Sequence, residues 1–399
     1  MKVITRIDGL HSQMEDGACV LLLFSGGLDS CHTLSQLTAA GLRVVALYVD
    51  LGEPLPATCK VARSIAEEVV VIEAERIFCD EYLSDGIICN ATYFGGMPLS
   101  STYTRPLIAR LAVDQARSKG IRVIASNVTA FQNTFFRFAK SIEVLAPELS
   151  FFCPSIGGYL DRAQKIAGLD PRFIEFFKDK PRGIYSVDEN LWCRVVENGD
   201  IEHPERSLPI SDICGASWKG APEQIAITFK AGFPTALNDV EMELGEICRE
   251  LNGRFTGHPH GFSYGLEGNV FGVKNPEPRM SMAGKLIHEG SGYIAQAVLS
   301  AAELQLREEL SRRFTISVIE GGWFTSYTDA LRSALHCLAK PISGRVSWQV
   351  TDRSCFVNTI APDKSSKIGA HLENFTCSVE NYDLSKKISF DLLKEHTHA

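Results

Sequence analysis

The chain has 399 residues, enough for two or three domains, and an ordinary globular composition. Its formal net charge is -8 at pH 7 with acidic and basic residues interspersed, which argues against the basic stripe of a nucleic-acid-binding protein. No apolar run reaches membrane-spanning length, and the first residues lack the core of a signal peptide. We therefore expect a cytoplasmic protein with reduced thiols and with neither a nucleic-acid nor a membrane partner.

The first half of the sequence alternates strand and helix patterns. Short apolar runs predict strands, and apolar residues spaced three and four apart predict helices. The predicted elements are a strand at 20–24, a helix at 30–40, a strand at 42–49, a helix at 57–66, a strand at 69–72, a helix at 105–119 and a strand at 121–125. This order predicts an α/β fold with a doubly wound parallel sheet, in which ligands bind outside the carboxyl ends of the strands.

The alternation ends at residues 155–185, where Pro, Gly, Lys and Asp cluster, and we interpret this stretch as a connection. The second half has a different, mixed architecture. Its predicted elements are strands at 226–230 and 268–273, helices at 240–251 and 300–315, and an antiparallel pair at 344–349 and 354–360.

The stretch Phe24–Ser30, with the sequence FSGGLDS, joins the first long strand to the first long helix. A glycine turn at a helix N-terminus favours anions, because unpaired backbone N–H groups point outward and the helix dipole favours negative charge. The two glycines let a phosphate approach the backbone, and the two serines add hydroxyl groups. Asp29 suits this position if it caps the helix or holds Mg²⁺ through water. The alternative is an ordinary strand-to-helix turn.

A second polar cluster follows the strand that ends at Ala125. Thr129, Gln132, Asn133 and Arg137 stand among aromatic residues there, which suits recognition of a polar small molecule. An aromatic core helix with incidental amides is the alternative.

The residue pattern does not indicate a metal centre of protein ligands. The twelve cysteines include no Cys-x-x-Cys pair. His258 and His260 lack a nearby Cys or carboxylate at ligand spacing, so we interpret them as part of a loop.

Over nearly its full length the chain resembles the argininosuccinate synthase family, and its SGGxDS pattern resembles the pyrophosphate loop of N-type ATP pyrophosphatases. The resemblance rests on Phe24–Ser30, Arg105–Ala109, Asn133 with Arg137 and Phe138, Leu145–Pro147, Ser186–Leu191, Glu267 and Gly321–Phe324. It implies an ATP- and Mg²⁺-dependent ligase that adenylates the ureido oxygen of citrulline. The amine of aspartate then displaces AMP, giving argininosuccinate, AMP and pyrophosphate in arginine biosynthesis.

The resemblance also implies site residues. Those expected to bind the nucleotide are Phe24, Ser25, Gly26, Gly27, Leu28, Asp29, Ser30, Val49, Ser126 and Asn127. Those expected to bind substrates are Met97, Thr102, Arg105, Thr129, Asn133, Thr134, Arg137, Ser186, Glu267 and Arg279. Of these two sets, the residues expected to act in catalysis are Ser25, Asp29, Ser30 and Arg137.

Several of these positions depart from the family pattern. Met97 and Arg279 stand where the family has tyrosines, Val195 where it has a serine, and Thr134 where it has an aspartate. Thr102 replaces a serine, and the 128–133 loop lacks two glycines and a lysine. Because buried sites built for hydroxyl contacts discriminate strongly, we expect an altered acceptor or amine, one that carries an extra acidic group. The alternative is an ordinary argininosuccinate synthase in which Arg279 faces solvent.

Two further interpretations are disfavoured. A tRNA-thiolation enzyme would call for paired cysteines and a basic surface, and a non-catalytic sensor would not explain the intact 24–30 loop. The resemblance implies a homotetramer. It also implies a nucleotide-binding domain at 1–180, a synthetase and multimerisation domain at 181–384, and an oligomerisation tail at 385–399 that reaches a neighbouring subunit or folds back on its own.

Overall fold

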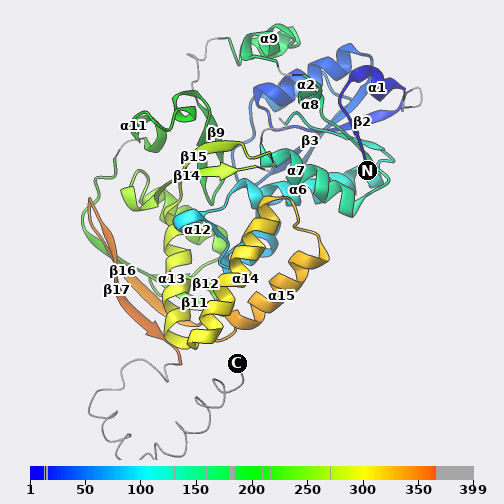
Figure 1. Cartoon of the computed structure of the whole chain (residues 1–399). Coiled ribbons are helices and arrows are strands. Elements are labelled where there is room, and N and C mark those ends of the chain that lie inside the picture. The colour runs from blue at the N-terminus through cyan, green and yellow to red at the C-terminus, as the bar shows by residue number, and fades with distance from the viewer. Residues whose placement is uncertain are drawn as a thin grey trace, which may run out of the picture.

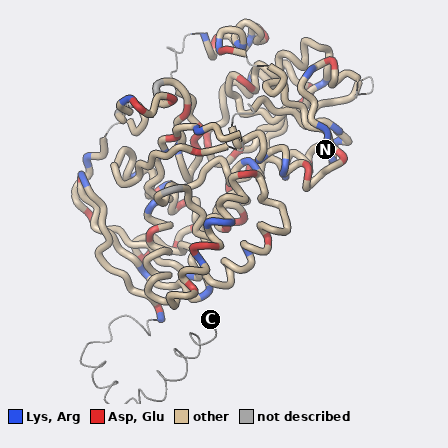
Figure 2. Tube along the Cα trace, in the orientation of Figure 1, with Lys and Arg blue, Asp and Glu red and all other residues tan. Residues whose placement is uncertain are grey.

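The computed structural model describes residues 1–364 except 13, 15, 16, 129–131, 159, 179–184, 209, 216 and 270. The chain forms an N-terminal part around a parallel sheet and a C-terminal part of antiparallel sheets and long helices (Figure 1). Both signs of charge are interspersed along the described trace (Figure 2). No helix in the described part of the chain is long and apolar enough to cross a membrane. The domain boundary predicted at residue 180 and the tail predicted at 385–399 lie outside the described residues.

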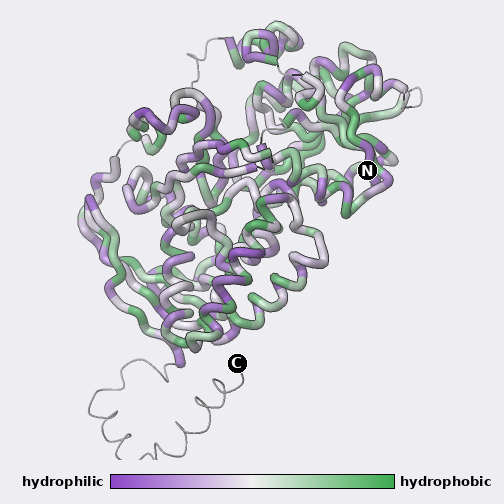
Figure 3. Tube along the Cα trace, viewed as in Figure 1, coloured by the Kyte–Doolittle hydropathy of each residue, from purple (hydrophilic) through white to green (hydrophobic). Residues whose placement is uncertain are grey.

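The N-terminal sheet has six strands, and every neighbouring pair is parallel. Hydrophobic residues dominate its strands (Figure 3). In spatial order the strands are β1 (Lys2–Ile4), β8 (Ser150–Phe152), β7 (Val123–Ala125), β2 (Cys19–Leu23), β3 (Arg43–Asp50) and β4 (Glu68–Glu73).

Helices cover both faces of this sheet. In β2, Val20 and Leu22 pack against α2 (Leu28–Ala39). The alternate residues of β2 pack on the opposite face, against α6 (Ser101–Ser118) and α7 (Asn133–Leu145). The predicted doubly wound α/β fold is therefore confirmed, although the three-residue strands β1 and β8 were not predicted from the sequence.

The C-terminal part contains a five-stranded antiparallel sheet, packed against long helices around the largest hydrophobic core. In spatial order its strands are β13 (Val240–Glu241), β12 (Phe233–Leu237), β11 (Glu223–Lys230), β16 (Gly344–Val350) and β17 (Cys355–Pro362). The helices are α12 (Leu244–Arg254), α13 (Met282–Val298), α14 (Ala301–Ile319) and α15 (Ser326–Ala339). The antiparallel pairing of β16 with β17 confirms the pair predicted at 344–349 and 354–360.

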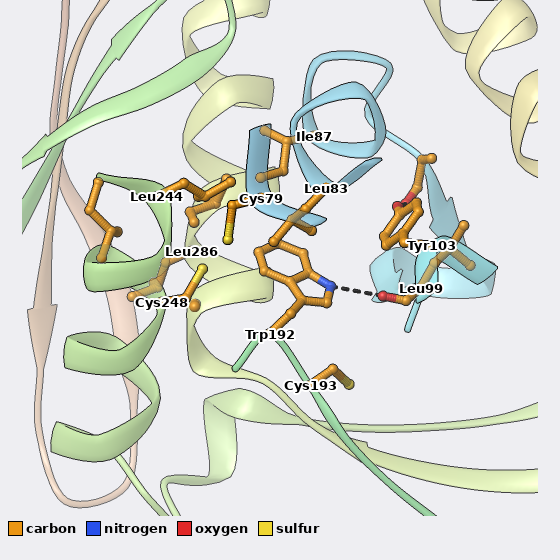
Figure 4. Close-up of a cluster of buried hydrophobic side chains, with 14 of the residues drawn as sticks. Cys79, Leu83, Ile87, Leu99, Tyr103, Trp192, Cys193, Leu244, Cys248 and Leu286 are labelled. Atoms are coloured by element: carbon orange, nitrogen blue, oxygen red, sulfur yellow. Dashed lines mark hydrogen bonds between the residues drawn. The ribbon is translucent and has the colours of Figure 1, made fainter. Parts of the chain in front are cut away.

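Trp192 is fully buried within this core, and its Nε1 donates to the Leu99 carbonyl at 2.8 Å (Figure 4). Cys79, Cys193 and Cys248 are buried among the same apolar side chains (Figure 4). Cysteines in such surroundings act as small hydrophobic residues.

A four-stranded antiparallel sheet, which we call the site sheet, completes the fold. Its order is β14 (Phe262–Gly268), β15 (Lys274–Met280), β10 (Arg194–Glu197) and β9 (Ser186–Glu189). Figure 1 shows its labelled strands β9, β14 and β15 near α6 and α7, and side chains of these two helices hydrogen-bond to the sheet.

The remaining elements are short. They are α1 (Ile7–His11), α3 (Thr58–Ala62), α4 (Glu75–Ile77), the π-helix η1 (Phe78–Leu83), α5 (Ser84–Ile88), β5 (Thr92–Tyr93), η2 (Phe94–Gly96), β6 (Met97–Pro98), α8 (Pro154–Gly157), α9 (Arg162–Ala167), α10 (Pro171–Ile174), η3 (Gly199–Glu202), α11 (Ile210–Cys214) and η4 (Pro259–Gly261).

Four predicted elements were wrong in part. The helix predicted at 57–66 is only the five-residue α3, which ends at Ala62. The strand predicted at 268–273 is mostly the turn between β14 and β15, where the Asn269 carboxamide accepts from the backbone N–H groups of Phe271 and Val273 at 3.0 Å. The helix predicted from Val240 begins at Leu244, because Val240 and Glu241 pair with β12 across a turn whose residues have positive φ. The connection predicted at 155–185 contains the short helices α8, α9 and α10.

Candidate functional site

The turn between β2 and α2 has a backbone conformation that requires glycine. Gly26 has φ of +75°, and a Cβ there would lie 2.6 Å from Cβ of Pro56 and 2.7 Å from Oγ1 of Thr58. Thr58 also donates its hydroxyl to the Gly26 carbonyl at 2.9 Å, which fixes the orientation of the turn. A side chain at this position would both strain the backbone and collide with the 56–58 segment.

The same turn exposes polar groups at the start of α2. The first hydrogen bond within the helix runs from the Cys31 N–H to the Gly27 carbonyl at 3.0 Å, so the preceding three N–H groups have no partner inside the helix. Ser30 Oγ donates to the same carbonyl at 2.9 Å and lies 3.3 Å from Ser25 Oγ. Exposed Ser25, Gly27 and Asp29 border this helix end, which suits a phosphate group.

Asp29 is not the N-cap of α2, since that position belongs to Gly27. Its Oδ1 lies 2.5 Å from Nζ of Lys165 on α9, so a cation stands beside the turn. Burial, reinforced by the Lys165 charge, lowers the pKa of His32, one turn further along α2. Sequence reasoning missed Lys165, because it lies in the stretch interpreted as a connection.

The ends of neighbouring strands meet at this turn. Asn127, just after β7, donates its Nδ2 to the Asp29 carbonyl at 3.3 Å and accepts a hydrogen bond from Ser155. Ser126 is held by its N–H to the Phe152 carbonyl at 2.9 Å, and Val49 lies near the carboxyl end of β3. The structure thus brings the residues predicted to bind the nucleotide to the carboxyl edge of the parallel sheet. Thr129, which follows β7 and was predicted to bind substrate, lies outside the described residues.

The register of the site sheet places the predicted acceptor residues on one face. Arg279 pairs with Val195 of β10, and Glu197 pairs with Ser186 of β9. Gly265 pairs with Glu277, and Glu267 lies two residues beyond Gly265 on β14. Because paired residues and residues two apart share a face, all of these positions point to the same side.

Met97 lies over this face. A Cβ on Gly265 would lie 3.0 Å from Cε of Met97, so the thioether packs against a strand position without a side chain. Met97 is buried, as is Thr102 on α6. The face therefore has an apolar cover at Met97 beside its charged residues.

Two buried arginine–glutamate pairs occupy the middle of the face. Arg137 Nη2 lies 2.7 Å from Oε1 of Glu267, and its other nitrogens donate to Ser101 Oγ at 2.7 Å and the Ile319 carbonyl at 3.0 Å. Arg279 donates Nε and Nη2 to Glu277 and donates Nη1 to the Pro98 carbonyl at 2.7 Å.

The two glutamates of these pairs differ in acidity. Burial and the negative charge of Glu267 raise the pKa of Glu277 to about 8. The pKa of Glu267 lies below its ordinary value. Burial alone would raise this pKa, but the positive charges of Arg137 and Arg279 outweigh burial. Arg279 is only 2% exposed, so it does not face solvent as the alternative interpretation expected.

Further charged groups border the face. Arg105 on α6 lies 2.6 Å from Asp188 on β9. Glu197 accepts from Nε2 of Gln132 at 3.1 Å, and burial and the Asp188 charge raise the pKa of Glu197. Ser186 on β9 is exposed at the margin of this face.

The N-terminus of α7 contacts the same sheet. Asn133 donates Nδ2 to the Gly268 carbonyl at 2.9 Å, and the Gly268 N–H donates to the Tyr93 hydroxyl at 2.9 Å. Oδ1 of Asn133 is buried and has no hydrogen-bond partner among the described residues. Half-buried Thr134 follows in the first turn of α7. Tyr93 was missed because nothing in its local sequence distinguishes it from a core aromatic residue.

The alternative interpretations of two segments can now be compared with the structure. Residues 133–145 form an amphipathic helix whose polar N-terminal residues contact the site sheet. The segment is therefore both a core helix and a part of the candidate site. His258 is the N-cap residue of the short helix η4 and His260 lies within that helix, and His258 Nε2 lies 2.8 Å from the Thr351 carbonyl. Within the described ranges, no group of three or more His, Cys, Asp or Glu side chains could hold a metal ion.

Comparison with known families follows the same division of the chain. Residues 19–171 match the arginosuccinate synthase N-terminal HUP domain, and residues 185–368 match the arginosuccinate synthase C-terminal domain. The chain belongs to the argininosuccinate synthase family. The resemblance inferred from the sequence is therefore confirmed, together with an α/β fold of HUP type followed by a mixed C-terminal part.

Curated members of the argininosuccinate synthase family match most of the chain. The argininosuccinate synthase of Rubrobacter xylanophilus is 32% identical over 343 residues, covering 84% of this chain and 83% of that protein. That of Thermoplasma volcanium is 30% identical over 392 residues, covering 95% of each chain. Homology to these synthases indicates a ligase.

Proposed function

We propose that this protein is an ATP-dependent, AMP-forming carbon–nitrogen ligase. It adenylates a carbonyl or ureido oxygen of an acceptor and releases pyrophosphate, and an amine then displaces AMP. The proposal is supported by family membership and by the anion-binding geometry of the 24–30 turn. Backbone N–H groups at the start of α2 would meet charge that develops on the departing pyrophosphate.

The groups around the turn fit a nucleotide with Mg²⁺. The exposed Asp29 carboxylate and the hydroxyls of Ser25 and Ser30 are oxygen ligands of the kind that hydrated Mg²⁺ takes. The ion would neutralise phosphate charge. Lys165, held beside Asp29, would contact the same phosphates and add a second positive charge.

The α7 N-terminus is our proposed site for the amine. The buried Oδ1 of Asn133 can only accept a hydrogen bond, and it lacks a partner in the described structure, so an N–H of the incoming amine would satisfy it. Aspartate is the proposed donor. Because Thr134 carries no charge, the ammonium of that donor would be held by hydrogen bonds instead of a carboxylate at this position.

We further propose that the acceptor is not citrulline. The observation that carries this proposal is the buried Arg279–Glu277 pair on the acceptor face. This pair occupies the place where the resemblance implies a tyrosine hydroxyl, while Met97 and Val195 remove two further hydroxyl groups. Polar groups of citrulline that relied on those hydroxyls would be left unpaired, which is costly in a buried site.

The environment of Arg279 limits which acceptor it can select. Each of its three guanidinium nitrogens donates to Glu277 or to the Pro98 carbonyl. A bidentate contact from Arg279 to an acidic group of the acceptor would therefore require the Glu277 pair to open. While the pair stays closed, Arg279 would affect acceptor binding by the volume that it fills and by holding the Glu277 carboxyl group in place.

Ordinary argininosuccinate synthesis is the second candidate. It is favoured by the presence of Ser186, Glu267 and Arg137 on or against one face, as the resemblance implies for citrulline binding. A homotetramer is proposed for either activity.

Exchange of labelled pyrophosphate into ATP tests the adenylation step without the amine. Wild-type protein would be incubated with Mg-ATP, labelled pyrophosphate and single acceptors: citrulline, other ureido compounds, and amino acids with side-chain amides or carboxylates. Exchange that depends on an acceptor other than citrulline, and is lost in Asp29→Ala, supports the proposal. Exchange with citrulline alone identifies the ordinary synthase, and exchange unaffected by Asp29→Ala contradicts the assignment of the loop.

A further inference from the structure

A basic side chain and an imidazole are buried in the C-terminal core, away from the site sheet. Arg307 lies on α14 and is 4% exposed, and His288 lies on α13 and is 6% exposed. Nδ1 of His288 is 3.2 Å from Oδ1 of Asn90, in the turn that follows α5. Helix α14 contacts β5, the strand just after Asn90, so α13, α14 and the segment that follows α5 converge here. Burial and the Arg307 charge lower the pKa of His288 to about 3.

The polar atoms of this cluster are unsatisfied. Nε and Nη2 of Arg307, Nε2 of His288 and Oγ of Ser311 are all buried and have no hydrogen-bond partner in the part of the chain that the structure describes. Ser311 lies one turn beyond Arg307, on the same side of α14. Buried polar atoms are nearly always hydrogen-bonded in folded proteins, so four such atoms together indicate a missing partner.

The charge of Arg307 is unpaired as well. Burial lowers the pKa of Arg307 to about 10, which still leaves it charged at neutral pH. On its own helix, the negative charge that acts on Arg307 is that of Glu308. Glu308 is exposed and forms no ion pair with Arg307 among the described residues. The Asp85 carboxylate of α5 is already bound by Arg332 at 2.7 Å and His336 at 2.9 Å. A buried guanidinium without a counter-ion is strongly unfavourable.

We propose that a small oxyanion, a carboxylate or a phosphate-like group, binds between α13, α14 and the end of α5. Nε and Nη2 form the edge of a guanidinium that binds two oxygens side by side, and these are the two unpartnered nitrogens of Arg307. Ser311 supplies a third donor. His288 supplies a fourth when the Asn90 carboxamide is turned, so that its NH₂ group donates to Nδ1 and Nε2 carries the ring proton.

This anion site would be joined to the acceptor face through one short segment. Asn90 begins the stretch that continues through Tyr93 and Met97 to Pro98. Tyr93 accepts from the Gly268 N–H, and the Pro98 carbonyl accepts from Arg279. The anion would therefore hold the first residue of a segment whose later residues contact the site sheet. The inference itself does not depend on the proposed function, since none of its four ligand groups belongs to that site.

Equilibrium unfolding of the full-length protein tests the site. Stability would be measured in sulfate, phosphate and acetate at several concentrations, each against chloride at equal ionic strength. The probes separate phosphate-like from carboxylate ligands. We expect saturable stabilisation, with the unfolding constant falling about tenfold once the anion reaches about ten times its Kd. Arg307→Met should lose this saturable response. Arg312→Met, which removes the same charge from an exposed position of α14, should retain it.

General salting effects would stabilise all three proteins alike and without saturation, and that result would overturn the proposal. Stability that rises with protein concentration but not with anions would also overturn it, because a second copy of the chain would then supply the counter-ion. Titration calorimetry of wild-type protein with phosphate and acetate is the second measurement, because it does not require Arg307→Met to fold. One saturable site per chain is expected for at least one of the two anions, and absence of saturable heat for both contradicts the proposal.

Discussion

Arg137 on α7 and Glu267 on β14 form a buried ion pair in which Nη2 and Oε1 are 2.7 Å apart. The two side chains are 2% and 4% exposed. The pair links the N-terminal part of the fold to the site sheet, and Arg137 is further tied to α6 through Ser101 and to α14 through the Ile319 carbonyl. It therefore fixes the position of the acceptor face relative to the nucleotide turn.

Glu267→Gln should destabilise the protein by about 3 kcal/mol, because it leaves the buried Arg137 without a carboxylate partner. Urea unfolding measures the change. Glu309→Gln breaks the exposed Glu309–Arg313 pair on α14 and should cost less than about 1 kcal/mol. Equal effects of the two substitutions would mean that the buried pair does not hold the two parts together.

Asp29→Ala should reduce AMP formation at least about 100-fold while leaving the fold intact, since Asp29 is exposed and borders the phosphate turn. AMP release and circular dichroism are the measurements. Glu67→Ala is the matched control, because it removes an exposed, Arg-paired carboxylate at the far end of the same sheet. AMP formation that survives the loss of Asp29 would refute the assignment of the loop.

Lys165→Met should raise the KM for ATP about tenfold, because a hydrogen bond to a charged group contributes about 1.5 kcal/mol. Initial rates at varied ATP concentration measure the effect. Lys60→Met changes an exposed lysine on α3 and should leave this KM unaltered. An unchanged KM in Lys165→Met would show that Lys165 serves only to orient Asp29.

Stability should fall as pH rises through the titration range of Glu277. Burial and the Glu267 charge raise its pKa from 4.5 to about 8, so the folded protein retains a proton that the unfolded chain loses. The stability associated with this proton is complete below about pH 4.5 and is lost by about pH 8. The difference in unfolding free energy between wild type and Glu277→Gln measures it. A difference that does not vary between pH 5 and 8 would contradict this account.

Local sequence patterns identified most of the N-terminal sheet, but not its three-residue strands β1 and β8. Continuous apolar runs and a glycine-rich turn identify β2, β3 and α2 because burial on both faces and phosphate-loop geometry leave clear local signals. The site sheet has no such signal. Strand β15 has charged residues at two buried positions, Glu277 and Arg279, which hydrogen-bond to each other.

The acceptor site could be predicted only in part for a related reason. The positions of Ser186, Glu267 and Arg279 followed from the family resemblance, and the strand register then brought them to one face. Lys165 and Tyr93 could not be found, because their contacts depend on how α9 and the 92–98 segment fold back onto distant elements. The solvent-facing interpretation of Arg279 failed because its partner Glu277 was not recognised.

The most direct test of the central claim is release of AMP and pyrophosphate from Mg-ATP with citrulline plus aspartate, followed by a panel of alternative acceptors and amines. We predict that wild-type protein with citrulline and aspartate releases no more AMP than the Asp29→Ala variant releases with the same substrates. We also predict that another acceptor in the panel supports AMP release that depends on both acceptor and amine. Robust release with citrulline and aspartate, with argininosuccinate as the product, would contradict the altered-acceptor account and establish an ordinary synthase.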